Sequence, residues 1–449
     1  MPQITYYSTN RQAPEVDFAQ ALFQGQAPDK GLYLPKNLPV FSAGDLRALF
    51  DKPYPEIAFA VLSRVLDGVV SEEALKSQCT DAYPFDVPIE KIDTATYVMR
   101  LDRGPTASFK DFAARMMARL MSGLRRPHRG SLIVLTATSG DTGSAIAHAF
   151  FRIPGIEVVV LFPPAEVSTR QRKQMTTLSE NVTAIGIEGK FDDCQTLVKQ
   201  AFADPELKSL ELTSANSINV GRLIPQTVYY VYASVRLQLE PIVFSVPSGN
   251  FGNMMGALLA KRMGLPIRRL VVSTNANDEV PRFLSTGRYE KIVPSRNCIS
   301  NAMNVGHPSN FARVVDAYGG RMDEAGTVHR QPDMEAMRRD LWATAVSDDD
   351  TRAAIRSAWK DQRLLLEPHG AVGWAGLLRY RRETGDGGLA VSVETAHPAK
   401  FPEEIETLLG IAPEVPESLF SVDAKKEEFH TLPAEYADFR RFLLRRFSG

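Results

Sequence analysis

The feature that most constrains the fold is a repeated unit, in which a short apolar run leads into a loop and then into a helical pattern. Five apolar runs of this kind are rich in β-branched residues, at 131–140, 156–164, 181–189, 241–247 and 267–278. Continuous apolar runs that alternate with helices are typical of parallel sheets whose two faces are both buried. The sequence therefore predicts an α/β protein built on parallel sheets.

The length of the chain predicts more than one such sheet. A chain of 449 residues is too long for one compact core, so two α/β domains are expected. From the placement of the motifs we predict an N-terminal segment or domain at 1–95 and a smaller α/β domain at 96–225. A larger α/β domain at 226–420 and a C-terminal helical extension at 421–449 complete the predicted organisation.

Composition excludes several classes of function. The formal net charge of −1 gives no reason to expect nucleic acid or an acidic membrane surface as a partner. The cysteines, Cys79, Cys194 and Cys298, are widely separated, so neither disulfides nor structural zinc is expected. The N-terminus lacks a basic region followed by an apolar run, and no run of about 18 apolar residues occurs anywhere. We therefore expect a cytoplasmic protein without a membrane partner.

Two strand-to-helix loops are candidates for ligand binding. They read "TATSGDTGS" at 136–144 and "VPSGNFGN" at 246–253. In open parallel sheets, ligands bind where strands end and helices begin. Gly249 and Gly252 would let backbone N–H groups approach a phosphate at the start of a helix. Neither a GxGxxG motif nor a P-loop lysine is present, which disfavours a nucleoside triphosphate. A tight turn with no ligand is the alternative.

A lysine at the start of a helix is the third unusual feature. In "TASFKDFAARMMARL", at 106–120, apolar residues recur with a helical period after Lys110. Thr106 or Ser108 could cap this helix. Lys110 then lies at the positive end of the helix dipole, which disfavours a cation. Such a lysine either extends into solvent or has a lowered pKa and a chemical role.

These features together favour pyridoxal phosphate as cofactor. That cofactor requires a lysine amine for a Schiff base and a cradle for its phosphate, and Lys110 and the 246–253 loop offer both. The pyridine nitrogen also needs a partner. Thr395 follows the apolar stretch "GLAVSVE" and would lie at the end of a strand, where its hydroxyl could meet that nitrogen.

Six motifs, in this order along the chain, resemble those of the threonine synthases of the longer, bacterial and fungal type. They are "APDKGLYLP", "GPTASFKDF", "TATSGDTGSA", "NSIN" followed by Arg222, "SGNFGN" and "ETAHPAKF". The resemblance spans nearly the whole chain. It implies the tryptophan-synthase-β-like fold of pyridoxal phosphate enzymes, with the cofactor in a cleft between two domains.

The resemblance also assigns the cofactor site residue by residue. Lys110 would carry the cofactor as a Schiff base and act in catalysis, Phe109 would lie beside the ring, and Thr395 would meet the pyridine nitrogen. The cofactor phosphate would be bound by one continuous loop, formed by Ser248, Gly249, Asn250, Phe251, Gly252 and Asn253.

The implied reaction converts O-phospho-L-homoserine and water into L-threonine and phosphate. The loop that would bind the substrate carboxylate consists of Thr138, Ser139, Gly140, Asp141 and Thr142. A helix dipole gives an exposed anion only about 0.3–1 kcal/mol, so the substrate phosphate needs charge-assisted partners. Asn216, Ser217 and Arg222 are the candidates for that site. A surface salt bridge is the alternative interpretation of Arg222.

Several residues near these motifs keep more than one interpretation. Asp141 stands where shorter relatives carry Asn beside the cofactor. Arg103 either contacts the substrate at the rim of the site or lies on the surface. His397 could orient its loop, and Lys400 could pair with an acid or assist the leaving phosphate. Gly370 and Gly373, in the segment 366–376, are expected to serve close packing.

Three functions are weighed against one another at this point. The first is the reaction above, the last step of threonine biosynthesis. The second is a lyase on the same scaffold that eliminates phosphate or water from a related amino acid and releases a keto acid. The third is a non-catalytic protein that binds a phosphorylated metabolite. We expect a monomer or a homodimer, with a small molecule, O-phospho-L-homoserine, as the partner.

Overall fold

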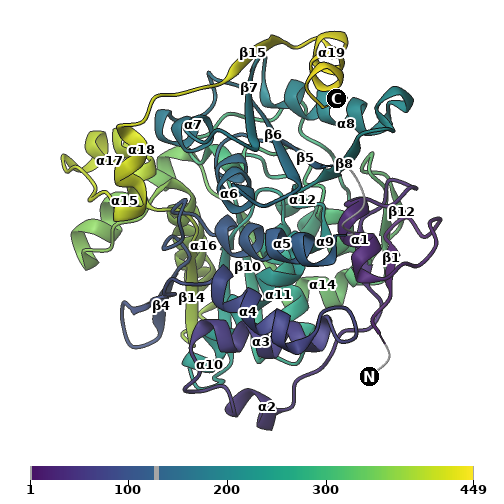
Figure 1. The fold of residues 1–449 in the computed structure, drawn as a ribbon. Helices are drawn as coiled ribbons and strands as arrows, with labels where there is room; N and C mark the ends of the chain where they lie inside the picture. The colour runs from purple at the N-terminus through teal and green to yellow at the C-terminus, as the bar shows by residue number, and fades with distance from the viewer. Residues whose placement is uncertain (1–2, 126–130, 448–449) are drawn as a thin grey trace.

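Two sheets with mainly parallel strands organise the chain, in a computed structural model that describes residues 3–125 and 131–447. Helices pack on the faces of both sheets (Figure 1). The predicted fold class is therefore confirmed. Among the described residues, no helix is long and apolar enough to cross a membrane.

The larger sheet has six strands, of which five run parallel. In sheet order they are β13 (Leu341–Ala345), β10 (Ile267–Thr274), β9 (Ile242–Pro247), β14 (Ala390–Glu394), β4 (Thr96–Arg100) and the antiparallel edge strand β3 (Ile89–Lys91). The sequence placed residues from 96 onward in the smaller domain. In the structure Thr96 pairs with Ala390, because β4 continues the larger sheet beside β14.

The smaller sheet has five parallel strands. In sheet order they are β15 (His430–Pro433), β7 (Val182–Glu188), β6 (Ile156–Phe162), β5 (Leu132–Ala137) and β8 (Glu211–Ser214). The edge strand β15 comes from the region predicted to be a helical extension. It has no apolar run to reveal it, since its backbone simply extends the sheet beside β7, as Figure 1 shows at the top of the molecule.

The N-terminal segment forms a small ribbon and a group of short helices. Its elements are β1 (Tyr6–Ser8), α1 (Phe18–Gln24), β2 (Tyr33–Pro35), α2 (Ala43–Arg47), α3 (Tyr54–Val65) and α4 (Glu72–Ala82). An aromatic cluster joins this segment to the rest of the core. The ring of Tyr54 lies 5.4 Å from that of Phe112, and Phe112 in turn lies 5.6 Å from Tyr229.

The remaining helices follow the strands of the two sheets. Those that precede β9 in the chain are α5 (Lys110–Leu124), α6 (Asp141–Phe150), α7 (Thr169–Thr176), α8 (Phe191–Ala203), α9 (Val220–Leu223) and α10 (Thr227–Arg236). Those that follow are α11 (Gly252–Arg262), α12 (Glu279–Thr286), α13 (Phe311–Ala317), α14 (Met334–Asp340), α15 (Asp348–Gln362), α16 (Pro368–Thr384), α17 (Pro402–Leu409), α18 (Glu417–Asp423) and α19 (Tyr436–Phe447).

Shorter elements complete the chain. They are the ribbon of β11 (Arg321–Met322) and β12 (Val328–Arg330), and the 3-10 turns η1 (Pro205–Leu207), η2 (Ile224–Gln226), η3 (Asn301–Met303) and η4 (Pro398–Lys400). The last helix, α19, lies in the predicted C-terminal extension. Phe439 and Leu443 are its buried side chains, and they join the apolar cluster beneath α8.

Candidate active site

The start of α5 lies beside the end of β14, which brings Lys110 close to the carboxyl end of that strand in the larger sheet. A short antiparallel bridge joins Ser108 to Ala396, and the N–H of Phe109 donates to the carbonyl of Thr395 at 2.9 Å. Helix α5 begins at Lys110 with Phe109 as its N-cap, and no side chain caps it. The predicted cap by Thr106 or Ser108 is wrong, because the hydroxyl of Thr106 instead donates to Asp111 at 2.7 Å.

Lys110 is enclosed and lies among charged groups. Its side chain is 13% exposed, and its Nζ lies 3.5 Å from Oδ2 of Asp141 and 4.8 Å from the ring centre of Phe109. Burial lowers the pKa of Lys110; the negative charge of Asp141 opposes this effect, while the positive charges of Lys400 and Arg222 add to it. Because the pKa is lowered overall, this side chain can supply the unprotonated amine that attacks a carbonyl.

The loop at 136–144 is shaped mainly by its own hydrogen bonds. The hydroxyl of Thr138 accepts from the N–H groups of Gly140 and Gly143, at 3.0 and 2.8 Å. Gly140 has a φ of 140°, which only glycine adopts readily, and an added Cβ would lie 2.6 Å from the side chain of Gln171. The side chain of Thr138 is thus used to fold the loop. Ser139 and Thr142 are the other hydroxyl residues that lie next to the start of α6.

Asp141 is the most strongly held side chain of that loop. Its Oδ1 accepts from Lys400 Nζ at 2.6 Å and from Gln171 Nε2 at 2.9 Å, while its Oδ2 faces Lys110. Burial alone would raise the pKa of Asp141, but the charges of Lys400 and Lys110 outweigh burial and hold it well below its usual range. Asp141 is therefore a carboxylate between two lysines. Of the two sequence interpretations of Lys400, the structure shows the pairing with an acid.

The loop at 246–253 exposes its backbone donors at the start of α11. Within the described residues, the N–H groups of Gly249, Asn250 and Phe251 find no acceptor in the protein. Phe251, the N-cap of α11, has a left-handed backbone with φ 62°, which is strained for a residue other than glycine. Unpaired donors at a helix N-terminus form a binding site for an anion such as phosphate.

Two asparagines of this loop anchor it to neighbouring elements. Asn253 accepts hydrogen bonds from the hydroxyls of Tyr229 and Tyr230, at 2.6 and 2.7 Å. Asn250 donates to the hydroxyl of Ser217 at 2.7 Å and accepts from the N–H of Ser309. Ser248 bonds within its own strand region, through its hydroxyl to the carbonyl of Val246. These contacts fix the loop from three sides.

Asn216, Ser217 and Arg222 form the turn that faces this loop. The side chain of Asn216 binds Thr136 and the carbonyl of Ala137, which ties the turn to β5. Arg222 is 2% exposed, so the alternative of a surface salt bridge is wrong. Its Nη1 donates to the carbonyl of Ala215 at 2.9 Å and its Nε has no partner; among the described residues no carboxylate pairs with it. Burial lowers the pKa of Arg222 to about 10.

The end of β14 carries the other residues that the sequence singled out. Thr395 is 5% exposed, and its carbonyl binds the residue before Lys110. His397 accepts from the N–H of Ala399 at 3.2 Å, and burial lowers its pKa to about 4, which agrees with a role in shaping the loop. The side chain of Arg103 is 41% exposed beside Asp102, at 3.5 Å.

The segment at 366–376 hides contacts that the sequence did not reveal. Glu367 caps α16 and binds Nδ1 of His369, while Nε2 of His369 accepts from the N–H of Ala302 at 3.0 Å. A Cβ at Gly370 would lie 1.6 Å from a carboxylate oxygen of Glu394, so close packing explains that glycine. The sequence offered no signal for His369, because its partner Ala302 is a backbone group from another element.

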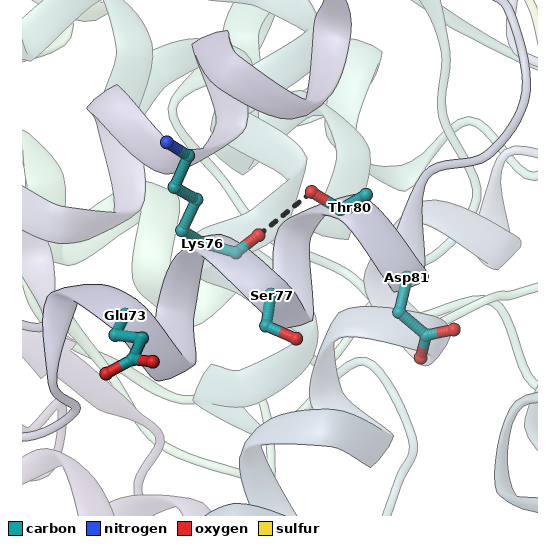
Figure 2. A pocket seen from close by; sticks show the side chains of 5 residues that line it. All are labelled: Glu73, Lys76, Ser77, Thr80 and Asp81. Atoms are coloured by element: carbon teal, nitrogen blue, oxygen red, sulfur yellow. Dashed lines mark hydrogen bonds between the residues drawn. The ribbon is translucent and has the colours of Figure 1, made fainter.

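A pocket of about 590 Å³ lies away from this cluster, on the outer side of α4. Figure 2 shows its lining side chains, which all come from α4: Glu73, Lys76, Ser77, Thr80 and Asp81. All five are exposed, and the hydroxyl of Thr80 simply donates to the carbonyl of Lys76. The side chains that line this surface hollow are all exposed, so the cluster around Lys110 is the stronger candidate for the functional site.

The cluster fits pyridoxal phosphate and not a metal ion. In residues 3–125 and 131–447, no group of three His, Cys, Asp or Glu side chains could hold a metal. Lys110 provides an amine of lowered pKa, and the 246–253 loop provides free N–H donors for a phosphate. A buried amide nitrogen of Asn253 also lacks a partner. These are the donors that the cofactor needs.

Comparison with known proteins agrees with this fit. Residues 82–395 match the family described as "Pyridoxal-phosphate dependent enzyme". The chain is therefore an enzyme of that class, and pyridoxal phosphate is its cofactor. Two further matches flank and overlap this region: the threonine synthase N terminus at 5–83 and the threonine synthase C-terminal region at 370–443.

Similarity along the full length identifies the family. Threonine synthase of Serratia marcescens is 38% identical over 98% of both chains. A crystal structure of threonine synthase from Brucella melitensis with bound PLP is 36% identical, covers 100% of both chains and superimposes with a TM-score of 0.91. The yeast enzyme is 27% identical over 99% of both chains, with a TM-score of 0.89. The chain belongs to the threonine synthase family, and the resemblance found in its sequence is confirmed.

Proposed function

We propose that the enzyme converts O-phospho-L-homoserine and water into L-threonine and inorganic phosphate. The observation that carries this proposal is Arg222, a buried guanidinium with an unpaired Nε and no carboxylate partner among the described residues. The positive charge of Arg222 contributes to the lowered pKa of Lys110. A buried cation that lies near the reactive lysine and has no acidic partner is stabilised by an anionic ligand, such as the phosphate of the substrate.

Lys110 is the residue that handles protons in the proposed reaction. Bound pyridoxal phosphate supplies an aldehyde for an amine and a ring that withdraws electrons from the substrate. In its unprotonated form, Lys110 takes the proton from Cα of the substrate and returns protons at later steps. Phosphate leaves from Cγ, and water adds at Cβ. The buried setting of Lys110 keeps bulk water from this amine.

The cofactor phosphate is assigned to the loop formed by Ser248, Gly249, Asn250, Phe251, Gly252 and Asn253. The free N–H groups at the start of α11 support this assignment, since α11 has 11 residues and its dipole favours an anion there. Phe109 and Thr395 would flank the ring. Both lie at the bridge between the start of α5 and the end of β14, next to Lys110.

The substrate is assigned to the two turns that face this cradle. Asn216, Ser217 and Arg222 would hold its phosphate, and Ser217 touches the cofactor loop through Asn250. The substrate carboxylate would lie at the start of α6, on the N–H groups of Ser139 and Thr142, since the N–H groups of Thr138 and Gly140 already donate within the protein. The side chain of Asp141 would not contact that carboxylate, because both of its oxygens face lysines.

The product distinguishes this proposal from a lyase on the same scaffold. Purified enzyme incubated with O-phospho-L-homoserine should release threonine and phosphate in equal amounts. Chromatography of the amino acids, together with an assay for 2-oxobutyrate, measures both outcomes. Release of 2-oxobutyrate and ammonia in place of threonine would show that the enzyme eliminates phosphate without adding water at Cβ.

We also propose that the enzyme works in the cytoplasm as a monomer or homodimer. All three cysteines are free, which suits a reducing compartment. Light scattering of the purified protein at micromolar concentration would decide between one chain and two, and a larger assembly would contradict the proposal.

A further inference from the structure

Three ionisable side chains from distant parts of the chain meet in the site, and one of them carries the reactive amine. Lys110 starts α5, Asp141 starts α6, and Lys400 ends the turn η4 that follows β14. The side chain of Lys400 is completely buried and that of Asp141 is 3% exposed. Water therefore screens these charges poorly, and each of them strongly affects the ionisation of the others.

The contacts within this triad are unequal. Nζ of Lys400 lies 2.6 Å from Asp141 Oδ1, whereas Nζ of Lys110 lies 3.5 Å from Asp141 Oδ2. Lys400 also donates to the carbonyl of Thr106 at 2.9 Å, so its ammonium is held from two sides. Gln171 donates to the same oxygen, Oδ1. The strong ion pair of Asp141 is thus the one with Lys400.

We propose that Lys400 is a positioning residue for the reaction: its buried ammonium neutralises Asp141, so that this carboxylate does not retain a proton on Lys110. One carboxylate and one ammonium leave the triad without net charge when Lys110 is a free amine. A proton on Lys110 would then add a buried charge with no counterion. Without Lys400, Asp141 would instead form its ion pair with protonated Lys110.

The other charged groups around the triad act in the same direction or are already occupied. Arg222 approaches from α9, and its positive charge further disfavours a proton on Lys110. Asp111 approaches from α5, but its two oxygens accept from the hydroxyl and the N–H of Thr106. His369 approaches from α16, and its ring nitrogens are already occupied, since Nδ1 contacts Oε2 of Glu367 and Nε2 accepts from the N–H of Ala302.

The reaction needs this arrangement at one point. Lys110 must be unprotonated to attack an aldehyde and to take a proton from the substrate. Its place at the N-terminus of α5 already disfavours a cation, but an adjacent unpaired carboxylate would reverse that preference. The role of Lys400 rests on the proposed function of Lys110 and specifies how the protein prepares that amine.

The test measures the ionisation of Lys110 directly, without substrate. Full-length protein is freed of cofactor, and its recovery of colour with added pyridoxal phosphate verifies the fold. Acetic anhydride then labels amines over a range of pH, and mass spectrometry quantifies acetylation of Lys110. In Lys400→Met the midpoint of labelling should move up by at least about one pH unit, which is about a tenfold loss of labelling at a pH below the midpoint. Uptake of pyridoxal phosphate at that pH should slow by a similar factor.

Matched variants separate a charge effect from a packing effect. The double variant Asp141→Asn/Lys400→Met removes both charges and should return the midpoint towards that of the wild type. Lys400→Arg keeps the charge and should leave the midpoint near the wild-type value. Lys261→Met is the control, because Lys261 also pairs with an aspartate, Asp340, at 3.5 Å, but far from Lys110 in the fold; it should change nothing.

Several results would overturn the proposal. One is a Lys400→Met protein that regains colour and shows the wild-type labelling profile of Lys110. Another is the same upward shift in Lys261→Met. Where Lys400→Met does not fold, Asp141→Asn decides, since it should lower the midpoint or leave it unchanged, and a rise contradicts the charge balance. Because no product is measured, a failure here is distinct from a failure of the threonine assay.

Discussion

The two strand-to-helix loops, 136–144 and 246–253, occupy equivalent places in the two sheets but treat charge in opposite ways. The first follows β5 and leads into α6, whose first residue is Asp141. The second follows β9 and leads into α11, whose first turn has no acidic residue. The negative charge of Asp141 lies at the positive end of α6, where the carboxylate accepts hydrogen bonds from Lys400 and Gln171. No acidic side chain adds such a charge at the start of α11.

The difference explains how one protein keeps a bound phosphate apart from the Asp141 carboxylate and the reactive amine of Lys110. In the second loop the free N–H groups of residues 249–251 can take a phosphate. In the first loop the carboxylate is bound by Lys400, and Lys110 lies beside it. On our proposals, a similar local topology thus gives an anion cradle in one sheet and control of the ionisation of Lys110 in the other. Single substitutions can test each half of this comparison.

The largest effect is expected at the amine that faces the first loop. Lys110→Ala should abolish turnover, since loss of proton transfer alone costs roughly 10²–10⁴-fold. The fold should persist, because the substitution removes a side chain that lies at the edge of the core. Steady-state kinetics with O-phospho-L-homoserine and circular dichroism measure the two outcomes. Multiple turnovers at the wild-type rate would remove Lys110 from the mechanism.

A smaller effect is expected at Arg222, which should serve the substrate and not the cofactor. Removing one hydrogen bond to a charged group costs roughly 1.5–3 kcal/mol. Arg222→Ala should therefore lower kcat/KM by about one to two orders of magnitude. The visible absorbance of the bound cofactor should stay unchanged, and inhibition by inorganic phosphate should weaken.

The opposite result for Arg222 would also be informative. Loss of cofactor colour in Arg222→Ala, with phosphate inhibition intact, would mean that the two phosphate sites are assigned the wrong way round. The second loop would then bind the substrate phosphate, and the comparison between the loops would have to be reversed.

A pair of glycines offers a matched test of the second loop. A Cβ at Gly249 would lie 2.8 Å from the backbone of Met303, whereas at Gly252 the nearest atom is 3.4 Å away, an ordinary contact. Overpacking costs about 1–3 kcal/mol, so Gly249→Ala should weaken cofactor binding about tenfold or more, while Gly252→Ala should have little effect. Titration of the cofactor-free protein followed by visible absorbance measures both affinities. Equal affinities would contradict the close fit at Gly249.

The smallest effect concerns the helix that follows the first loop. Burial lowers the pKa of His148 in α6 to about 4 from an ordinary value of 6.5. Because the folded pKa is depressed, the unfolded chain binds the proton first, and stability falls as the pH drops from about 6.5 towards 4. About 1–2 kcal/mol should be lost between pH 7 and pH 5. Urea unfolding of the wild type and of His148→Gln measures it.

The control for this last prediction is the difference between the two proteins and not the absolute stability. Other groups titrate in the same range, but they are common to both chains. The acid-induced loss should therefore be smaller in His148→Gln by about the same 1–2 kcal/mol. Equal losses in the two proteins would show that His148 is not held neutral in the fold.

Local patterns were sufficient to find the central strands and the helix after Lys110. The apolar runs at 156–164 and 241–247 became β6 and β9, since a strand buried on both faces needs such a run. The edge strand β15 was missed, because an edge strand of a few mostly exposed residues carries no comparable signal. The cap of α5 was also wrong, because Asp111 competes for the hydroxyl of Thr106.

The sequence by itself determined the class of enzyme, the cofactor and the order of the motifs. Each motif consists of residues within a few positions of one another, where the reach of backbone donors and the period of a helix are fixed locally. Only the tertiary structure decided the partners of Asp141, the burial of Arg222 and the role open to Lys400. The ionisation of a buried group depends on charges only a few ångströms away, and here the fold brings those charges together from distant parts of the chain.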